Sequence, residues 1–345
     1  MPHPIQFLLK NKFKRASQQK PGGFTLIEVL VAIIIASLVI TPLLGFMISI
    51  LRTDRQEQAK ATTEQEIQSA LNYIAEDLQQ SVYIYDKDSL YGETDDSTNP
   101  PTVLYNKIVD QLPPEASNDA NNGGGCAANE CIPVLVFWKR DLRKDILPIG
   151  GADCGTNPED CDDTFVYSLV AYYIVKGDSS NPTWSNAARI ARFEISNAVE
   201  IPNPSAPTTT LTLKDKDPGF AMFDLGGDGT LKQKMNKWEK GSGNYNVNFG
   251  NKVLVDYVDQ SPKSIPSTAC DADEQLVPNQ GANIPTGLYA CVTNPAEGKN
   301  SARVYIRGNA LARIQNSNIE YSASKDTYFP TASVEVEARG FLSTK

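Results

Sequence analysis

One stretch decides how this chain of 345 residues is organised: Phe24-Thr-Leu-Ile-Glu-Val-Leu-Val-Ala-Ile-Ile-Ile-Ala-Ser-Leu-Val-Ile-Thr-Pro-Leu-Leu-Gly-Phe-Met-Ile-Ser-Ile-Leu51. Glu28 is its one charged side chain. As an α-helix the stretch would reach roughly 42 Å at ~1.5 Å per residue, more than the ~30 Å hydrocarbon core of a bilayer. The sequence therefore predicts one membrane-spanning helix, and no second run of this kind follows.

The residues before this stretch are basic. Residues 1–23 contain five of the 32 basic residues and none of the 41 acidic ones, so the rest of a chain with a total charge of -9 carries -14. Positive charge ahead of a span keeps the N-terminus cytoplasmic, and we expect everything after Leu51 to be exported. A secretory signal peptide has a shorter apolar region, so we expect the span to be retained. The acidic remainder argues against nucleic-acid binding.

Glu28 lies near the start of the apolar run, where an unpaired carboxylate is costly and requires a cation. The segment Pro21-Gly-Gly-Phe-Thr-Leu-Ile-Glu-Val-Leu30 resembles the processing site of type IV prepilins and type II secretion pseudopilins. The resemblance implies that a membrane-embedded aspartyl peptidase cuts after Gly23 on the cytoplasmic side and methylates the Phe24 amine. It also implies that Glu28 pairs with the Phe24 amine of a neighbouring subunit and sets the axial register of a fibre. The alternative is a carboxylate that snorkels to the interface of a plain anchor.

The helix is expected to continue beyond the membrane to Gln80, since residues 52–80 contain no proline or glycine. Pro42, inside the span, predicts either a kink or melted turn or a proline that the membrane helix tolerates. Residues with helical spacing form an apolar face that should lie on a sheet, namely Ile67, Ala70, Leu71, Ile74, Ala75, Leu78 and Val82. Residues 70–80 are similar to the corresponding helix of J-type minor pseudopilins. We assign Glu76 and Asp77 to the opposite, solvated face.

From residue 81 the sequence changes to short β-rich segments between polar, glycine-rich and proline-rich connections. The expected strands are Ser81–Tyr85, Thr102–Tyr105, Pro133–Trp138, Phe165–Val175, Ala188–Glu194, Thr209–Leu213, Val253–Tyr257, Ala302–Arg307 and Ala332–Ala338. The expected loops include residues 95–101, 113–125, 202–207 and 260–300. The fold class is α+β, a pilin-like lollipop with one antiparallel sheet on the long helix. Its predicted divisions are a removed leader (1–23), a transmembrane half-helix (24–51), an amphipathic half-helix (52–80) and a head (81–345).

All the cysteines follow the span and lie in segments expected to be loops. They are Cys126, Cys131, Cys154, Cys161, Cys270 and Cys291. An even number in an exported segment predicts three disulfides, and six cysteines allow 15 pairings. We favour the sequential pairs, in which each bond would close a glycine- or proline-rich loop. Free buried thiols are the alternative.

Catalytic and metal-binding patterns are sparse. The one histidine, His3, lies in the basic leader, so triads and His-ligated zinc have no imidazole in the head. The segment Asp224-Leu-Gly-Gly-Asp228-Gly-Thr resembles part of a calcium loop, but its ligand spacing is not that of an EF-hand, and a plain glycine turn is favoured. We therefore expect no cofactor, with calcium at Asp224 and Asp228 as the alternative, and a protein that is not an enzyme.

Two later segments, residues 253–258 and 304–314, resemble the hormogonium polysaccharide secretion pseudopilins of filamentous cyanobacteria, most closely the C type. This resemblance implies a minor pseudopilin of the inner membrane that enters a periplasmic or surface fibre and supports polysaccharide secretion and gliding. Its implied partners are the prepilin peptidase, other major and minor pilins, the assembly platform and secreted polysaccharide. Arg307 and Arg313 are expected to be surface or packing residues rather than polysaccharide ligands.

Two other functions stay open at this point. A minor type IV pilin could act as an adhesin or receptor through its loops, and exposed aromatic residues there would favour it. Trp184 and Trp238 are the tryptophans in such loops. A membrane-anchored hydrolase would instead require a deep pocket with paired carboxylates.

Overall fold

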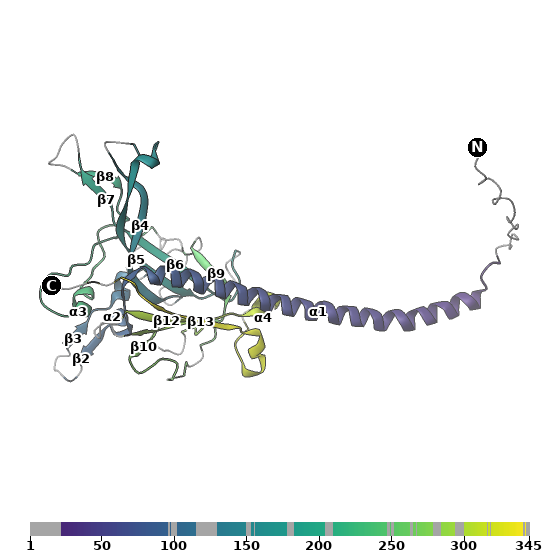
Figure 1. Cartoon of the computed structure of the whole chain (residues 1–345). Helices are drawn as coiled ribbons and strands as arrows, with labels where there is room; N and C mark the ends of the chain where they lie inside the picture. Colours follow the sequence, from purple (N-terminus) through teal and green to yellow (C-terminus); the bar gives the residue numbers. More distant parts are fainter. Residues whose placement is uncertain are drawn as a thin grey trace, which may run out of the picture. The chain divides into compact units, whose positions relative to one another are not determined.

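The computed structural model describes residues 22–95, 97, 102–114, 130–149, 153–154, 156–177, 183–203, 210–246, 249, 252–262, 265–266, 268–278, 284–293, 300–315, 317, 319–340 and 342. The chain divides into two compact units, Met1–Asp54 and Arg55–Lys345. Figure 1 traces its elements in chain order. The helices are α1 (Leu26–Gln79), α2 (Lys87–Tyr91), α3 (Leu231–Met235) and α4 (Ala310–Gln315), with 3-10 turns η1 (Ile108–Gln111), η2 (Pro158–Asp160) and η5 (Ala323–Tyr328). The strands are β1 (Ser81–Ile84), β2 (Glu93–Asp95), β3 (Thr102–Tyr105), β4 (Cys131–Pro148), β5 (Cys161–Val175), β6 (Ala188–Ser196), β7 (Val199–Pro202), β8 (Thr210–Lys214), β9 (Val253–Val258), β10 (Glu274–Val277), β11 (Leu288–Thr293), β12 (Ser301–Arg307) and β13 (Thr331–Glu337).

In the first unit, α1 contains an apolar window that is long enough to cross a membrane. Its large hydrophobic side chains are exposed from Leu26 to Leu51, as expected of a surface that meets lipid or other helices. The helix continues through Pro42 without a break. The melted turn is therefore absent, while a kink at this proline stays a prediction.

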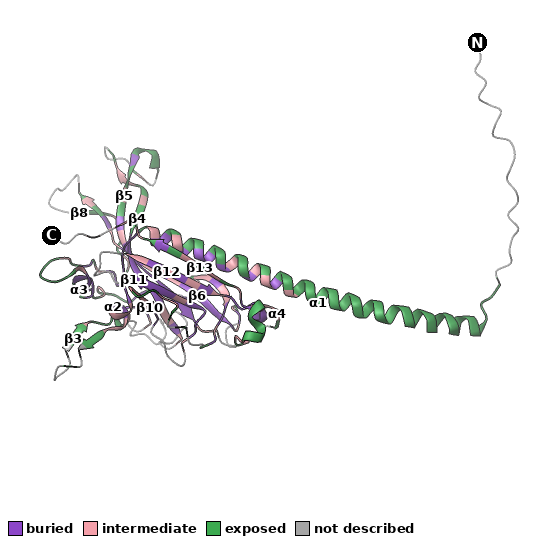
Figure 2. Cartoon of the chain, turned by 60° about the horizontal axis from the view of Figure 1, so that its bottom comes forward, coloured by how far each residue is buried: buried purple, intermediate pink, exposed green. Residues whose placement is uncertain are grey.

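In the second unit, the remainder of α1 presents the predicted apolar face to the core. Ile67, Leu71, Ile74 and Leu78 have no exposed surface, and Ala75 is partly buried. Figure 2 shows this change along α1, which is exposed in its first part and alternates with buried positions from Ala59 on. The 3.6-residue spacing of apolar side chains accounts for this pattern, because such residues share one side of a helix.

A five-stranded antiparallel sheet has the strand order β1-β4-β5-β6-β9. Its central strands are buried on both faces, as the continuous apolar runs of β4 and β5 require. Val134 to Trp138 and Leu169 to Val175 are all almost inaccessible to solvent. Beyond Lys139 the β4 strand becomes exposed, so the outer half of the β4–β5 hairpin lies outside the core. β1 and β9 form the two edges.

A second antiparallel sheet, with the order β10-β11-β12-β13, shares the hydrophobic core. Along β12, Ala302, Val304 and Ile306 are buried and alternate with partly exposed side chains, which is the pattern of a sheet with one covered face. Two short ribbons, β2–β3 and β7–β8, complete the described strands. The prediction of a single sheet was therefore wrong, while the antiparallel α+β class with a long helix on sheets is confirmed.

Gly308 lies where α1 and both sheets meet. It forms a β-bridge with Val258 of β9 and directly follows β12. A Cβ atom at this glycine would lie 2.3 Å from the Thr63 side chain and 3.5 Å from that of Ile67. Glycine is thus the residue that lets the sheet approach α1 this closely.

Each of the nine expected strands corresponds to a strand of the structure. Thr102–Tyr105 has the bounds of β3, and the other eight are shifted at one or both ends. The expected loop at residues 260–300 was wrong, because it contains β10 and β11. Pro202 ends β7 and Asp95 ends β2, so these two expected loops begin at strands. Most of residues 95–101, 113–125 and 202–207 lies outside the described residues.

Candidate functional site

The predicted processing site lies at the beginning of α1. Gly22 and Gly23 precede the helix, and a Cβ atom added to either would meet no atom within 4 Å. Phe24 is 80% exposed. The Gly23–Phe24 peptide bond therefore lies in accessible, non-helical backbone, which is the conformation that a peptidase needs in order to reach a bond.

The helix start is fixed by Thr25. Its hydroxyl oxygen accepts a hydrogen bond from the Glu28 backbone N–H at 3.3 Å, and its carbonyl accepts from Glu28 and Val29. This is the backbone half of a capping box, with glutamate in the first turn where the helix dipole favours negative charge. The Glu28 side chain is exposed and makes no ion pair with the described residues. Capping thus places the carboxylate one turn from Phe24 and leaves it facing outward.

Residues 19–44 match the family model of the prokaryotic N-terminal methylation motif. This motif supports a type IV pilin-like protein. The match spans Gly23, Phe24 and Glu28 and includes much of the apolar run. No curated protein and no solved structure matches the chain. The motif implies processing by a prepilin peptidase and assembly with other pilins, and it indicates a structural subunit rather than an enzyme. With the apolar helix, it indicates a membrane-anchored type IV pilin-like chain.

The head of this pilin-like chain contains a buried ionic cluster that the sequence analysis missed. Asp77 was assigned to the solvated face, and this was wrong, because the residue is 7% exposed. Its carboxylate accepts from Lys139 of β4 at 3.0 Å, from the Tyr172 hydroxyl of β5 at 2.6 Å and from Arg192 of β6 at 2.7 Å. Its helical neighbour Glu76 is exposed, as expected. One carboxylate thus joins α1 to three strands.

The neighbouring charges in this cluster shift the pKa values of its acidic groups. Burial would raise the pKa of the Asp77 carboxyl, but the hydrogen bond and charge of Arg192, followed by the charge of Lys139, hold the pKa below its usual value. Glu194 contacts the same two cations, Arg192 at 2.6 Å and Lys139 at 3.3 Å, and its pKa is also lowered. Burial and the Asp77 charge raise the pKa of the Tyr172 hydroxyl, which stays protonated as a donor. The carboxylates of Asp77 and Glu194 thus face the cations of Arg192 and Lys139, and the Asp141 carboxylate lies 4.0 Å from Lys139 at the edge of the cluster.

Two of the predicted disulfides are confirmed, Cys154–Cys161 and Cys270–Cys291. The third predicted pair includes Cys126, which lies outside the described residues, while Cys131 is disulfide-bonded. No described cysteine is free, so buried thiols are excluded for these positions. The placement of all cysteines in loops was wrong in part: Cys131 and Cys161 each begin a strand, and Cys291 lies within β11.

The metal-site candidates offer little chemistry. Asp224 and Asp228 are both exposed, and an Asp224 carboxylate oxygen accepts from the Gly226 N–H at 2.8 Å, as in a tight turn. Calcium at this turn stays a prediction. The sulfurs of Cys270 and Cys291 and the Glu274 carboxylate lie within 4.8 Å of one another. Because these two sulfurs form a disulfide, they are not available as thiolate ligands.

The structure shows the contacts of the two arginines and two tryptophans that the sequence brought into question. Arg307 contacts the buried Asp259 carboxylate at 2.7 Å, and Arg313 pairs with Glu66 of α1, so each has an acidic partner within the chain. Trp238 is 4% exposed and supplies no adhesive surface. Trp184 lines a cavity between α1 and β9, described below.

Proposed function

We propose that the chain is a minor pseudopilin, a subunit that enters a type II secretion-like or type IV pilus-like fibre through its N-terminal helix. The observation that carries this proposal is the N-terminal methylation motif over residues 19–44, coincident with an exposed Gly23–Phe24 bond and the first turn of α1. The leader directs the chain into the membrane, the peptidase cuts after Gly23, and the apolar helix remains on the mature subunit.

Glu28 gives the assembly its register. Cleavage creates a positive charge on the Phe24 amine, and the Glu28 carboxylate lies one turn along the helix. The two charges of one subunit are adjacent, so a neighbour displaced along the fibre axis can satisfy both. In an apolar surrounding an unpaired charge is costly, and this cost selects the displacement that pairs amine with carboxylate.

The test uses Glu28→Gln, which removes the charge and keeps the shape. We expect this variant to be processed normally but to be absent from sheared fibres of the native organism. The matched control is Glu57→Gln, an exposed acid of α1 outside the apolar run that pairs with Lys60. Normal incorporation of Glu28→Gln into fibres would contradict the proposed role of the carboxylate.

The finer part of the proposal concerns cargo. We extend the proposal to polysaccharide export and gliding, on the resemblance drawn from residues 253–258 and 304–314 in the sequence. Deletion of the gene should abolish the extracellular polysaccharide that a lectin stain detects and should stop gliding, while complementation restores both. Unchanged polysaccharide in the deletion strain would refute this role and leave the assembly proposal intact.

A further inference from the structure

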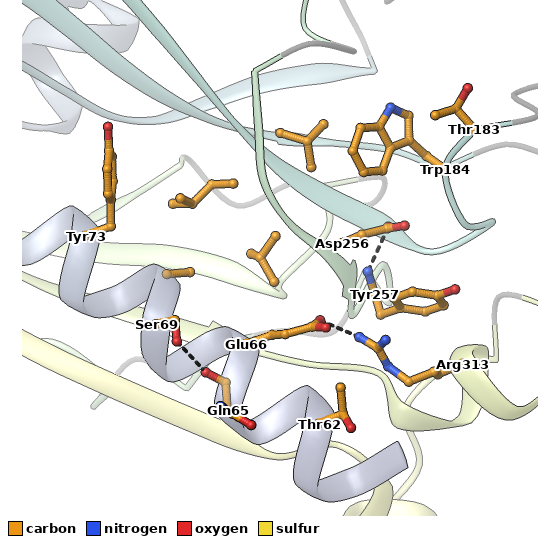
Figure 3. Close-up of a pocket in the computed structure, with 14 residues that line it drawn as sticks. Thr62, Gln65, Glu66, Ser69, Tyr73, Thr183, Trp184, Asp256, Tyr257 and Arg313 are labelled. Atoms are coloured by element: carbon orange, nitrogen blue, oxygen red, sulfur yellow. Dashed lines mark hydrogen bonds and ion pairs between the residues drawn. The ribbon is translucent and has the colours of Figure 1, made fainter. Parts of the chain in front are cut away.

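A cavity of about 930 Å³ lies between α1 and the edge strand β9, within the unit Arg55–Lys345. Its α1 wall is a stripe of polar and aromatic side chains with helical spacing, adjacent to the buried face; they are Thr62, Gln65, Glu66, Ser69 and Tyr73. Figure 3 shows this stripe opposite the residues of β9, with Trp184 beyond them. The cavity is open to solvent on the side of Tyr73, which is 44% exposed.

The β9 wall has an irregular backbone. Val258 pairs with Ala188 and Val255 with Ile190, so β9 carries one residue more than β6 between these pairs. Tyr257, inside this bulge, has φ = 58°. A non-glycine residue in this region costs about 1–3 kcal/mol, and bulges re-aim side chains. The strain is located where Tyr257 is turned into the cavity wall.

The polar groups of the cavity are held in place by neighbours. The Asp256 carboxylate accepts from the Ser185 N–H at 2.9 Å and from its hydroxyl at 2.7 Å. Arg313 of α4 pairs with Glu66, as Figure 3 shows, and stacks 4.1 Å from the centroid of the Tyr257 ring. A site whose hydrogen-bonding groups are fixed before a ligand arrives loses less entropy on binding.

This combination of groups matches one ligand chemistry. Aromatic rings such as Trp184 and Tyr73 present flat apolar faces that fit the C–H faces of pyranose rings, because both surfaces gain by leaving water. The amide, hydroxyl and carboxylate groups around them are suited to sugar hydroxyls, which donate and accept hydrogen bonds. A purely apolar ligand would cover these polar groups with a surface that offers them no hydrogen bond in place of water.

The charge and size of the cavity indicate which class of sugar it can bind. Among the described residues that line the cavity, Glu66 and Asp256 outnumber the cation Arg313, which Glu66 already neutralises, so an acidic sugar would be repelled. The volume is at the upper end of the ~300–1,000 Å³ range that encloses small ligands. We propose that the cavity between α1 and β9 binds a neutral oligosaccharide. This binding goes beyond fibre assembly and uses neither Phe24 nor Glu28.

The test measures binding by the full mature chain in phospholipid nanodiscs, since sugar-based detergents would compete. The probes are cellohexaose, maltohexaose and chitohexaose, with hexagalacturonic acid as the acidic comparison. Calorimetry and tryptophan fluorescence follow each titration, because Trp184 lies at the site while Trp138 and Trp238 are buried. We expect saturable binding of at least one neutral hexasaccharide.

Substitutions of residues in the cavity wall test whether the sugar binds there. Trp184→Ala and Tyr73→Ala should each weaken it at least tenfold, while Tyr289→Ala, at a partly exposed tyrosine of β11, should leave it unchanged. Tyr73→Ala keeps the test valid if the tryptophan variant misfolds, because this side chain is largely outside the core. No neutral binding up to roughly 10 mM, a preference for the acidic probe, or retention of affinity in the Tyr73 variant would overturn the proposal. A negative result in these binding experiments would not affect the proposals of processing at Gly23 and assembly through Glu28, so the two proposals are tested separately.

Discussion

Asp77→Asn is the perturbation whose effect the structure predicts in most detail. The substitution keeps the shape of the side chain and removes the negative charge that faces Arg192 at 2.7 Å and Lys139 at 3.0 Å. Removing one partner of a buried ion pair costs about 3–5 kcal/mol, because the remaining charge is left uncompensated. Glu194 still contacts both cations, so one of the two charges stays neutralised. We therefore expect a loss near the lower limit, about 3 kcal/mol.

The assay is equilibrium unfolding in urea of the full chain in nanodiscs, followed by tryptophan fluorescence, to which the fully buried Trp138 contributes. A loss of about 3 kcal/mol corresponds to a fall of about 6 °C or more in the Tm of a domain of this size. The matched control is Glu76→Gln, which changes the adjacent exposed acid and should alter stability by less than about 0.5 kcal/mol. Equal stability of the two variants would refute the conclusion that this cluster anchors α1 to the strands.

Three further perturbations test other parts of the head. The pKa of Asp77 is lowered below 3.8 in the fold, so its contribution to stability is complete well above pH 3.8 and is lost as the pH falls below that value. Urea titrations between pH 7 and pH 2.5 should therefore show a smaller loss of stability on acidification for Asp77→Asn than for the unchanged chain. Replacing both cysteines of the Cys270–Cys291 disulfide by serine should lower the free energy of unfolding by about 3 kcal/mol, and the same change at Cys154–Cys161 by about 2 kcal/mol. The first bond has a sequence separation of 21 and the second of 7, so loss of the first gives the unfolded chain more entropy. Equal urea midpoints for the two variants would contradict this. Gly308→Ala should cost about 1–3 kcal/mol in the same assay, because its methyl group would enter the space of the Thr63 side chain, and an unchanged midpoint would show that α1 moves away freely.

The long helix and its buried face could be predicted because helical spacing reports burial directly. Asp77 has this spacing too, seven residues after Ala70 and adjacent to Leu78, so the signal for its burial was present. Its charge argued for solvent, and the partners that reverse this argument lie 62 and 115 residues away in the sequence. A buried carboxylate is predictable only together with the strands that supply its cations.

The strands were predictable where β-branched and aromatic residues form runs, as in β4 and β5. β10 has four residues of mixed polarity, and it is a strand because residues 274–277 pair with residues 290–293 of β11. β11 does contain a β-rich run, but it lies between polar, proline-rich segments that favour a loop assignment. Pairing between short segments depends on the whole fold, so the second sheet could not be derived from local sequence.

The candidate sites also differ in whether the sequence alone reveals them. The proposed processing site is continuous in sequence, and it lies within residues 19–44, which match the N-terminal methylation motif. The cavity wall draws on α1, β9, α4 and the residues 183–184, which only the fold brings together. The bulge that turns Tyr257 has no signal in the residues Asp256-Tyr257 themselves.

The central claim is that this chain is a pilin-like subunit cut between Gly23 and Phe24. Intact-mass and N-terminal analysis of protein from the native membrane tests it most directly, with a strain that lacks the prepilin peptidase as the comparison. The account predicts a mature chain that begins at N-methylated Phe24 in the native strain and retains residues 1–23 in the peptidase mutant. The same terminus in both strains, whether Met1 or an unrelated residue, would contradict it.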